Sequence, residues 1–283
     1  MKTKRKDERG REILYGVHAV KEALSAGTRA IDRAWISSFD GGEPALKALV
    51  KELEQRSIQP EVVSRKDLSR LCRSQDHNGI AASASPYRYA GMDGILTAIG
   101  SEPALVLVLD RIQDPNNLGA ILRTAECSGV HGIFIPSRHA AGITPAVVRA
   151  SAGASEYVRI ARVGSIANLI GRLKKAGMWI FGLEEGGDSV WTGVDLTESA
   201  AIVMGSEGRG LRRLVRERCD CLVSLPTKGQ VECLNVSVAC GIVLYEAVRQ
   251  RADFVVKASD AANVPSERSP DRLSEKLGPE DKG

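Results

Sequence analysis

Three segments of the sequence carry side chains that could do chemistry, and each one directly follows an apolar run. Residues 110–126 contain Asn117 and Arg123, residues 204–210 are Met-Gly-Ser-Glu-Gly-Arg-Gly, and residues 225–245 contain Asn235. Amide, carboxylate and guanidinium groups bind polar substrates, orient them and stabilise charge that develops during a reaction. The three segments are therefore candidate parts of one active site.

The first segment predicts a helix. Asn116 or Asn117 is the expected N-cap, and Gly129 is the expected end of the helix. In that helix Arg123 lies three residues before Glu126, so a surface ion pair of little energetic value would by itself explain the arginine. Taken alone, the segment indicates only a capped surface helix.

The second segment is rich in glycine. Gly205, Gly208 and Gly210 would let backbone amides approach a ligand, but they match neither the Gly-x-Gly-x-x-Gly dinucleotide fingerprint nor a Walker phosphate loop. Glu207 would repel a phosphate, so a neutral or cationic ligand fits better. Four arginines are expected on one side of the next helix, where they would be solvated or would contact RNA phosphates: Arg209, Arg212, Arg213 and Arg216.

The third segment predicts another capped helix, with Asn235 or Ser237 as its N-cap. Val238, Ile242 and Tyr245 recur at helical spacing and are expected to pack inward. A polar cap and an apolar core helix would account for these residues without any function.

The apolar runs that precede these segments predict the architecture. Between residues 101 and 252, apolar runs alternate with amphipathic stretches, and the runs are 104–109, 132–135, 178–183, 201–204 and 221–225. Continuous apolar strands separated by helices are typical of an α/β fold with a parallel sheet covered on both faces. Ligands bind at the carboxyl ends of such strands, which is where all three segments lie.

Changes in composition divide the rest of the chain. The expected parts are a basic flexible leader at 1–11, a small α/β domain at 12–84, a linker at 85–100, the α/β domain described above at 101–252, and a disordered tail at 253–283. The tail is almost free of large apolar residues, so it cannot bury enough surface to offset the entropy lost on ordering.

The composition is that of a globular protein, with 43% hydrophobic residues, 26% charged residues and a formal net charge of +4. The longest uncharged run, residues 233–245, is too short to cross a membrane, and no apolar stretch follows the basic N-terminus. We therefore expect a cytoplasmic protein with no membrane partner. The six cysteines form no Cys-x-x-Cys pair and lie among apolar neighbours, which favours reduced, mostly buried thiols over a disulfide framework or a metal site.

Together and in this order, the three segments resemble the motifs of a known family. Asn117-x-Gly-x-x-x-Arg123, Met204-Gly-Ser-Glu-Gly, and Leu225-Pro with Leu234-Asn-Val-Ser-Val-Ala downstream resemble the three motifs of the SpoU (TrmH-like) RNA ribose 2′-O-methyltransferases. The resemblance covers residues 101–252. Upstream, residues 13–20 and 77–81 resemble the ends of the substrate-binding domain in the large-subunit rRNA guanosine methyltransferases of that family.

This resemblance implies a fold, a reaction and a site. The fold would be a SPOUT-type parallel sheet with a C-terminal trefoil knot, preceded by a small L30e-like RNA-binding domain. The enzyme would be an RNA (guanosine-2′-O-)-methyltransferase that uses S-adenosyl-L-methionine to methylate a guanosine ribose in 23S rRNA. It would be a homodimer whose active sites borrow residues from both subunits. Carried over by motif, Gly205, Leu225 and Leu234 would hold the cofactor, and the catalytic residues would be Asn117, Arg123, Glu207 and Asn235.

One residue departs from the family pattern, and one role has two interpretations. Cys233 stands where the family usually has serine, and a thiol is a poorer hydrogen-bond partner of similar size. Arg123 is often given the role of base in the family, but a guanidinium stays protonated far above neutral pH, so a hydrogen-bond donor or phosphate anchor is at least as good an interpretation. The reaction needs no histidine, and His18 and His77 are expected to be structural or to face RNA.

Three other functions stay open at this point. A non-catalytic RNA-binding protein would share the basic residues but would not need three motifs at strand ends. A nucleotide-dependent oxidoreductase would share the sheet, but the chain lacks the fingerprint glycines and the acidic residue that binds ribose. Methylation of tRNA would use the same site, and the domain at 12–84 is the feature that disfavours it.

Overall fold

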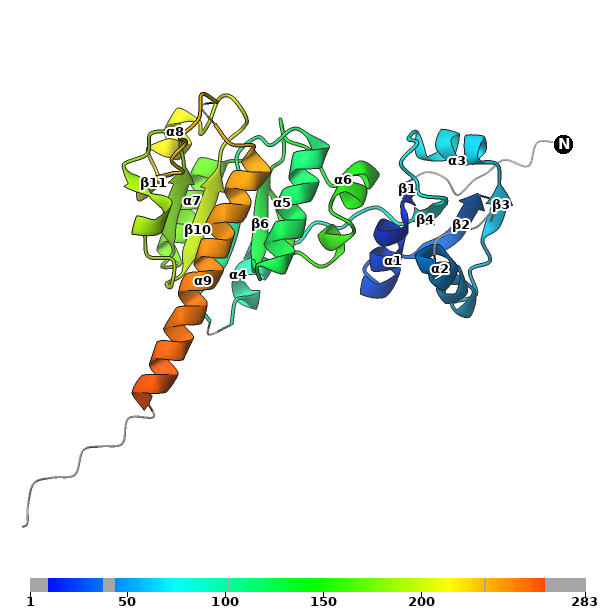
Figure 1. Cartoon of the computed structure of the whole chain (residues 1–283), viewed down its shortest axis with the longest axis horizontal. Helices are drawn as coiled ribbons and strands as arrows, with labels where there is room; N and C mark the ends of the chain where they lie inside the picture. Colours follow the sequence, from blue (N-terminus) through cyan, green and yellow to red (C-terminus); the bar gives the residue numbers. More distant parts are fainter. Residues whose placement is uncertain (1–9, 38–43, 101, 232, 263–283) are drawn as a thin grey trace, which may run out of the picture.

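The computed structural model of the chain describes residues 10–37, 44–100, 102–231 and 233–262, with side chains described as far as residue 254. Within these residues the chain forms two sheets, each with its own helices (Figure 1). The smaller sheet belongs to the N-terminal part of the chain and the larger sheet to the remainder. None of the described helices has the length and apolar character needed to cross a membrane.

The smaller sheet has four strands in the order β1-β4-β2-β3. β4 is antiparallel to both of its neighbours, and β2 and β3 are parallel. Leu14, Leu49, Leu53 and Ile80 are fully or almost fully buried between this sheet and its helices. The elements are β1 (Glu12–Tyr15), α1 (Val17–Ala26), β2 (Ile31–Ser37), α2 (Pro44–Gln55), β3 (Glu61–Val63), α3 (Arg65–Cys72) and β4 (Ile80–Ala84).

The larger sheet has seven strands in the order β7-β6-β5-β10-β8-β11-β9, and all of its pairs are parallel. The expected α/β fold with a parallel sheet is therefore confirmed. Its strands are β5 (Leu105–Leu109), β6 (Gly132–Pro136), β7 (Ile160–Val163), β8 (Trp179–Leu183), β9 (Ser189–Val190), β10 (Ala200–Met204) and β11 (Cys221–Ser224). Its helices are α4 (Met92–Ala98), α5 (Pro115–Cys127), α6 (Pro145–Ala150), α7 (Ile166–Lys175), α8 (Arg213–Arg216) and α9 (Val236–Ala262), with 3-10 turns η1 (Ala154–Glu156) and η2 (Trp191–Gly193).

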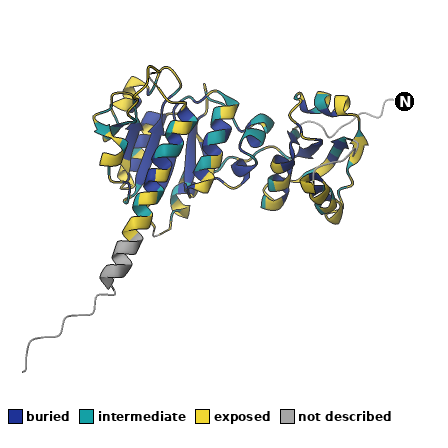
Figure 2. Cartoon of the chain, viewed as in Figure 1, coloured by how far each residue is buried: buried dark blue, intermediate teal, exposed yellow. Residues whose placement is uncertain are grey.

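Helices cover both faces of the larger sheet, and the strands divide its core into two layers (Figure 2). Every residue of β5 is buried. Leu105, Leu107 and Leu109 pack in the layer of α5 and α9, whereas Val106 and Val108 pack in the layer of α4 and α7. Burial on both faces explains why this strand is continuously apolar rather than alternating.

The three chemical segments meet because β5 and β10 are neighbours in the larger sheet. From β5 the sheet continues through β6 and β7, and from β10 it continues in the opposite direction through β8 and β11. The loops after β5 and β10 therefore leave the sheet side by side at a topological switch point, where α/β folds bind ligands. Helix α9 packs against α5, which brings the third segment to the same place.

Residues 85–100 are more structured than a linker. They contain α4, in which Ile95 is fully buried and contacts Gly132 of β6. Ala90 also pairs with Ala161, so the segment extends the edge of the larger sheet. The glycines around α4 concealed its apolar spacing in the sequence.

The expected boundaries of the leader and the tail also change. Arg11 forms a 2.6 Å ion pair with Asp32, whereas residues 1–9 lie outside the described residues. Helix α9 continues to Ala262, so residues 253–262, which the expected tail included, are helical. Residues 263–283, the rest of the expected tail, lie outside the described residues.

The buried face of α9 differs from the prediction. Val238 and Tyr245 are 51% and 52% exposed, whereas Cys240, Val243 and Leu244 are buried. The helix carries two apolar stripes, and the sheet covers the stripe that contains Cys240, Val243 and Leu244. An apolar stripe that includes Val238 and Tyr245 is therefore left on the surface of this chain.

Candidate active site

Two aspartates fix the loop after β5. The side chain of Asp110 is fully buried, accepts a 2.9 Å hydrogen bond from Nε of Arg212 and forms an ion pair with its Nη2 at 2.7 Å, which ties this loop to the one after β10. Asp114 caps α5 by accepting from the backbone N–H groups of Asn116 and Asn117 at 3.3 and 3.2 Å. The prediction that one of these asparagines caps the helix is wrong. As a result, the side chain of Asn117 is available for another contact.

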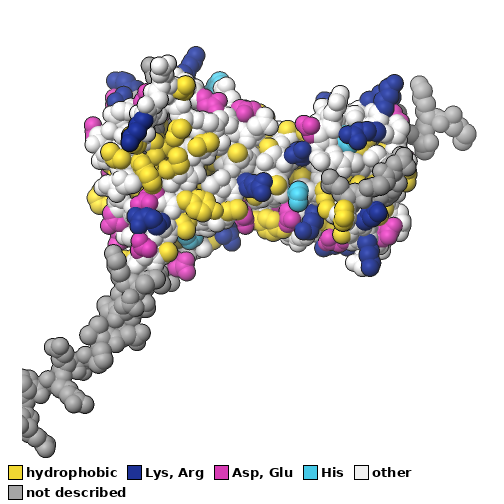
Figure 3. Space-filling model, in the orientation of Figure 1, with side chains coloured by type: hydrophobic (Ala, Val, Ile, Leu, Met, Phe, Trp, Pro, Cys, Tyr) yellow, Lys and Arg dark blue, Asp and Glu magenta, His cyan; other side chains and the backbone are white. Residues whose placement is uncertain are grey.

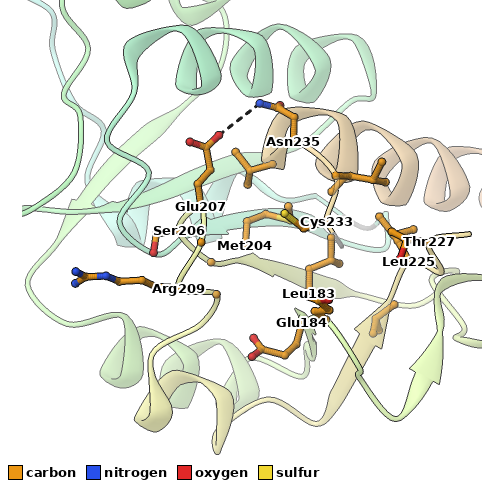
Figure 4. Close-up of a pocket in the computed structure, with 18 residues that line it drawn as sticks. Leu183, Glu184, Met204, Ser206, Glu207, Arg209, Leu225, Thr227, Cys233 and Asn235 are labelled. Carbon is orange, nitrogen blue, oxygen red and sulfur yellow. Dashed lines mark hydrogen bonds between the residues drawn. The ribbon is translucent and has the colours of Figure 1, made fainter. Parts of the chain in front are cut away.

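Three of the four predicted catalytic residues form one hydrogen-bonded cluster, which we call the amide cluster: Asn117, Glu207 and Asn235. Asn117 Nδ2 donates to Glu207 Oε1, and Asn235 Nδ2 donates to Asn117 Oδ1 at 3.0 Å and to Glu207 Oε1 at 3.4 Å. Figure 4 shows the contact between Asn235 and Glu207. Each residue comes from a different one of the three segments.

Asn235 also begins α9. Its Oδ1 accepts hydrogen bonds from the backbone N–H and the hydroxyl of Ser237 at 2.9 and 2.6 Å, so of the two expected caps Asn235 is the one found. The cap fixes the side chain of Asn235 at the start of the helix while its Nδ2 remains directed at the amide cluster.

Arg123 is separate from the amide cluster. Its side chain is exposed on α5. Among the described residues it makes no hydrogen bond or ion pair, either with Glu207 or with Glu126. The surface ion pair with Glu126 is therefore not formed, and one copy of the chain does not bring this guanidinium into the cluster.

A cavity of about 620 Å³ opens beside the amide cluster (Figure 4). It lies at the carboxyl ends of β8, β10 and β11. Glu207 and Asn235 line it, and so do the three residues predicted to hold the cofactor, Gly205, Leu225 and Leu234. Its volume is that of a small-molecule site. The predicted cofactor residues thus share one cavity with two of the predicted catalytic residues.

The glycine-rich loop after β10 closes on itself. Ser206 and Gly210 exchange two backbone hydrogen bonds of 3.1 and 2.9 Å, and the φ angles of Gly208 and Gly210 are 71° and 58°. A Cβ on Gly205 would overlap the backbone of Gly210 and lie 2.6 Å from the backbone nitrogen of Leu211. Glycine is therefore required at 205 because the backbone of Gly210 and Leu211 passes close to it. The sequence pattern instead indicated that a ligand would lie close to the glycines.

Carboxylates predominate among the charged groups that line the cavity. Glu184, Glu185 and Glu207 line it together with Arg209. Glu184 is held at the loop because its Oε2 accepts a 3.2 Å hydrogen bond from the backbone N–H of Leu211. This charge distribution favours a ligand with a positive centre over one with a phosphate.

The arginines after the loop do not share one helix face. Helix α8 contains only four residues, Arg213–Arg216. Arg212 precedes the helix and binds the buried Asp110, whereas Arg213 forms a 3.5 Å surface ion pair with Glu217. The predicted row of four arginines is therefore wrong, because a buried carboxylate takes one of them.

The cysteines are all free, but they are less buried than expected. Cys72 and Cys240 are buried, and burial raises the pKa of Cys72 to about 11 and that of Cys240 to about 12. Cys127 and Cys233 are exposed, and Cys233 lines the cavity. Within the described ranges, no group of His, Cys, Asp or Glu side chains is arranged to hold a metal ion.

His77 is structural. Its ring is fully buried, with Nε2 3.0 Å from the hydroxyl of Ser69 and Nδ1 accepting from the backbone N–H of Gly79 at 3.1 Å. Burial lowers the pKa of His77, so the neutral form is favoured. His18, by contrast, is exposed on α1.

Family comparisons match both halves of the chain. The model of the SpoU rRNA Methylase family matches residues 104–245, and a model described as RNA 2′-O ribose methyltransferase substrate binding matches residues 13–90. The chain belongs to the SpoU rRNA methylase family. The family expected from the three motifs is therefore confirmed.

Individual relatives of this SpoU methylase match along most of its length. The 23S rRNA (guanosine-2′-O-)-methyltransferase RlmB of Coxiella burnetii is 39% identical over 240 residues, which are 84% of this chain and 95% of that protein. The crystal structure of an RNA 2′-O ribose methyltransferase has a TM-score of 0.73 and 26% identity, and the match covers 89% of this chain and 93% of that one. The AdoMet-bound rRNA methyltransferase from Sinorhizobium meliloti has a TM-score of 0.69 and 25% identity, with 86% and 88% covered.

Three residues that shape the site of this SpoU methylase were not predicted from the sequence: Asp110, Asp114 and Glu184. Asp114 could have been found, because an aspartate before a helix-starting proline is a common N-cap. Asp110 and Glu184 gave no local signal, since their partners lie 102 and 27 residues away in the sequence.

Proposed function

We propose that the chain is an RNA (guanosine-2′-O-)-methyltransferase that uses S-adenosyl-L-methionine to methylate a guanosine ribose in 23S rRNA. The observation that carries the proposal is the amide cluster, formed by all three motifs at the edge of one cavity. The name of the Coxiella relative supplies the substrate, and that relative matches this chain over both sheets. An enzyme with this substrate acts in the cytoplasm.

The residues that line the cavity suit S-adenosylmethionine in their polarity and charge. Leu225 and Leu234 offer apolar contacts, and the loop at Gly205 offers backbone groups. The carboxylates of Glu184 and Glu207 suit the positive sulfonium. When bound, S-adenosylmethionine supplies an activated methyl group on that sulfonium.

The residues of the chain then have to place the ribose hydroxyl and stabilise the oxygen as it loses its proton. We assign Asn117 and Asn235 to hold the motif loops in register, because their amides bind each other. Glu207, which accepts from both amides, is assigned to position the substrate. Alignment of the hydroxyl and stabilisation of the developing charge provide most of the rate in such a transfer.

We further propose that the active form is a homodimer in which the partner subunit's Arg123 completes the site. Arg123 is exposed on α5, away from the amide cluster of its own chain. Helix α9, which packs against α5, exposes Val238 and Tyr245, and Leu234 in the loop just before the helix is also exposed. Figure 3 shows hydrophobic side chains gathered over this part of the surface. Apolar surface of this kind is typical of a protein interface.

The finer fold assignments belong to the same proposal. A trefoil knot is supported by the position of β11, which pairs between β8 and β9 before the chain returns to pack α9 on α5. An L30e-like, RNA-binding role for residues 12–84 is supported by their compact α/β sheet and by the substrate-binding match. In this proposal residues 101–252 are the methyltransferase domain.

The proposal is tested by mapping ribose methylation in cells with and without this protein. Loss of the protein should remove one 2′-O-methylguanosine from 23S rRNA and leave tRNA methylation unchanged. Expression of the wild-type chain should restore the mark, and an Asn235→Ala variant should not. Loss of a tRNA mark alone would show that the methyltransferase assignment holds while the rRNA assignment is wrong.

A further inference from the structure

The two halves of the molecule meet along a polar interface that the proposed reaction does not use. On one side are β1, α1 and the turn before β4, and on the other are α6 and η1 (Figure 1). We call this interface the junction. It contains a buried ion pair, several hydrogen bonds around that pair, and a closely held connecting segment.

Arg29 lies at the centre of the junction. Its side chain is 1% exposed, and it donates from Nε to the Ser85 carbonyl at 2.7 Å and from Nη1 to Glu156 Oε1 at 3.3 Å. It also pairs with Glu12. The side chain of Glu156 is fully buried and accepts a second bond, of 2.9 Å, from the hydroxyl of Thr28. One guanidinium thus joins β1, the start of the connecting segment and η1.

A buried ion pair of this kind defines geometry more than it adds stability. Removing both charges from water is costly, and the cost is recovered only when the hydrogen bonds are well formed. A rotation of one half against the other would leave Arg29 or Glu156 buried with incomplete bonding. The pair therefore favours one relative orientation of the halves.

More exposed contacts on both sides of the pair limit rotation further. Arg149 donates to the Asp76 carbonyl at 2.9 Å and to Asn78 Oδ1 at 3.3 Å. The hydroxyl of Tyr157 donates to Glu22 Oε2 at 2.7 Å. Because these contacts come from α6 and from the residue after η1, the junction is held at separated points rather than at one hinge.

The backbone also approaches α1 closely at Gly153. The φ of Gly153 is +87°, and a Cβ there would overlap the side chain of Glu22 and lie 3.2 Å from the His18 carbonyl. Close approach of backbone to helix leaves little room for the two halves to slide.

The connecting segment is itself attached to the larger sheet. The backbone N–H of Ala90 donates to the carbonyl of Ile160 at 2.8 Å, and the Tyr89 hydroxyl accepts from the backbone N–H of Ile143 at 2.8 Å. The guanidinium of Arg162 lies 4.0 Å from the centre of the Tyr89 ring. Few residues therefore remain without an attachment between Ser85, which Arg29 holds, and Tyr89, which the larger-sheet half holds.

We propose that Arg29 and Glu156 are positioning residues, which hold the RNA-binding half at one fixed orientation to the amide cluster. This inference rests on the proposed function. RNA held by residues 12–84 presents its target ribose to the cavity only when the distance and angle between the two halves match the folded RNA. The junction thus selects structured RNA of one shape, and it acts on RNA binding rather than on methyl transfer.

The test compares Glu156→Gln with the matched control Glu52→Gln. The control removes a carboxylate from the surface pair with Arg56, in the N-terminal half and away from the junction. With a structured 23S rRNA fragment, Glu156→Gln should raise KM about tenfold or more, because only the correctly oriented fraction of molecules binds the RNA at both halves, while kcat at saturating RNA and the affinity for S-adenosylmethionine stay within about twofold. Small-angle X-ray scattering should show a larger radius of gyration for Glu156→Gln than for the wild type, and Glu52→Gln should match the wild type in every measurement.

A double variant covers the case in which Glu156→Gln fails to fold. Arg149→Gln combined with Tyr157→Phe leaves the buried pair intact and removes the exposed contacts. It should raise KM in the same direction without loss of cofactor binding.

Two results would overturn the inference. One is an unchanged KM in a variant whose scattering shows loosened halves, and the other is a scattering profile identical to that of the wild type. If instead the wild-type chain methylates no RNA, the proposed function fails, and scattering of Glu156→Gln still decides whether the pair fixes the orientation of the halves.

Discussion

Arg123 and the residues of the amide cluster belong to the same three motifs, yet only the cluster residues are joined by hydrogen bonds, while Arg123 is exposed on α5. Asn117, Glu207 and Asn235 could be predicted as neighbours because each follows a recognisable strand end. The exposure of Arg123 agrees with the surface-helix interpretation of its segment, because the buried Ile121 and Leu122 turn Arg123 outward. Its separation from the other three motif residues could not be predicted, since that depends on how the loops meet in the folded chain.

Replacing Arg123 by alanine separates charge stabilisation from cofactor binding. Because Arg123 does not line the cavity, Arg123→Ala should leave the affinity for S-adenosylmethionine near the wild-type value. Methyl transfer to rRNA should fall about 10²-fold or more if the guanidinium stabilises the oxyanion or anchors the phosphate. Single-turnover kinetics measure the loss. Arg172→Ala, which breaks a surface pair with Asp93, is the control and should retain full activity.

Gly205 offers a second test at this scale. A methyl group there would overlap the backbone of Gly210, so Gly205→Ala must open the loop that forms one wall of the cavity. We expect at least about tenfold weaker binding of S-adenosylmethionine by calorimetry and a free energy of unfolding lower by about 1–3 kcal/mol. Gly164→Ala, with nothing within 4 Å of the added carbon, should change neither quantity. Equal binding by the two variants would contradict the assigned role of the loop.

His77 makes stability depend on pH. Burial lowers its pKa below the ordinary 6.5, so the unfolded chain binds a proton that the folded chain does not. Stability from this group is therefore complete above pH 6.5 and falls as the pH drops toward the folded pKa, by at most about 1.4 kcal/mol per pH unit. Urea unfolding of the wild type and of His77→Gln between pH 7.5 and 5.5 should show this slope only in the wild type. His18→Gln should behave like the wild type.

At the scale of elements, length and continuity of apolar sequence decided what could be predicted. The runs at β5 and β10 are apolar throughout and were found. β7 was missed because Arg162 interrupts it, and β9 has only two residues. α4 was missed because Gly91 and Gly94 lie at its start.

Helix α9 shows that helical spacing alone does not identify the buried face.

The exposed stripe of α9 should be the dimer interface, so Val238→Asp combined with Tyr245→Lys should yield a folded monomer by analytical ultracentrifugation. Methyl transfer should be lost with the dimer, because in the proposed function each site uses Arg123 of the other chain. Val62→Asp, at a 63% exposed residue of β3, should stay dimeric and active. A fully active monomer would refute the shared site.

At the scale of the whole molecule, the arrangement of parts depends on contacts that no local pattern shows. Arg29 and Glu156 are 127 residues apart, and Asp110 and Arg212 are 102 apart. The order in which β11 enters the sheet is equally invisible in the apolar runs. The family resemblance predicted a knot and a separate RNA-binding unit. The sequence by itself showed only that the amino-acid composition changes near residue 85.

The most direct test of the account uses purified protein, S-adenosylmethionine labelled in its methyl group, and unmodified transcripts of 23S rRNA and tRNA. We predict that the label enters 23S rRNA alone, at up to one methyl per transcript, on the 2′ oxygen of one guanosine. Nuclease digestion and mass spectrometry identify the modified nucleoside. Label found on a base, on another ribose or only in tRNA would contradict the central claim.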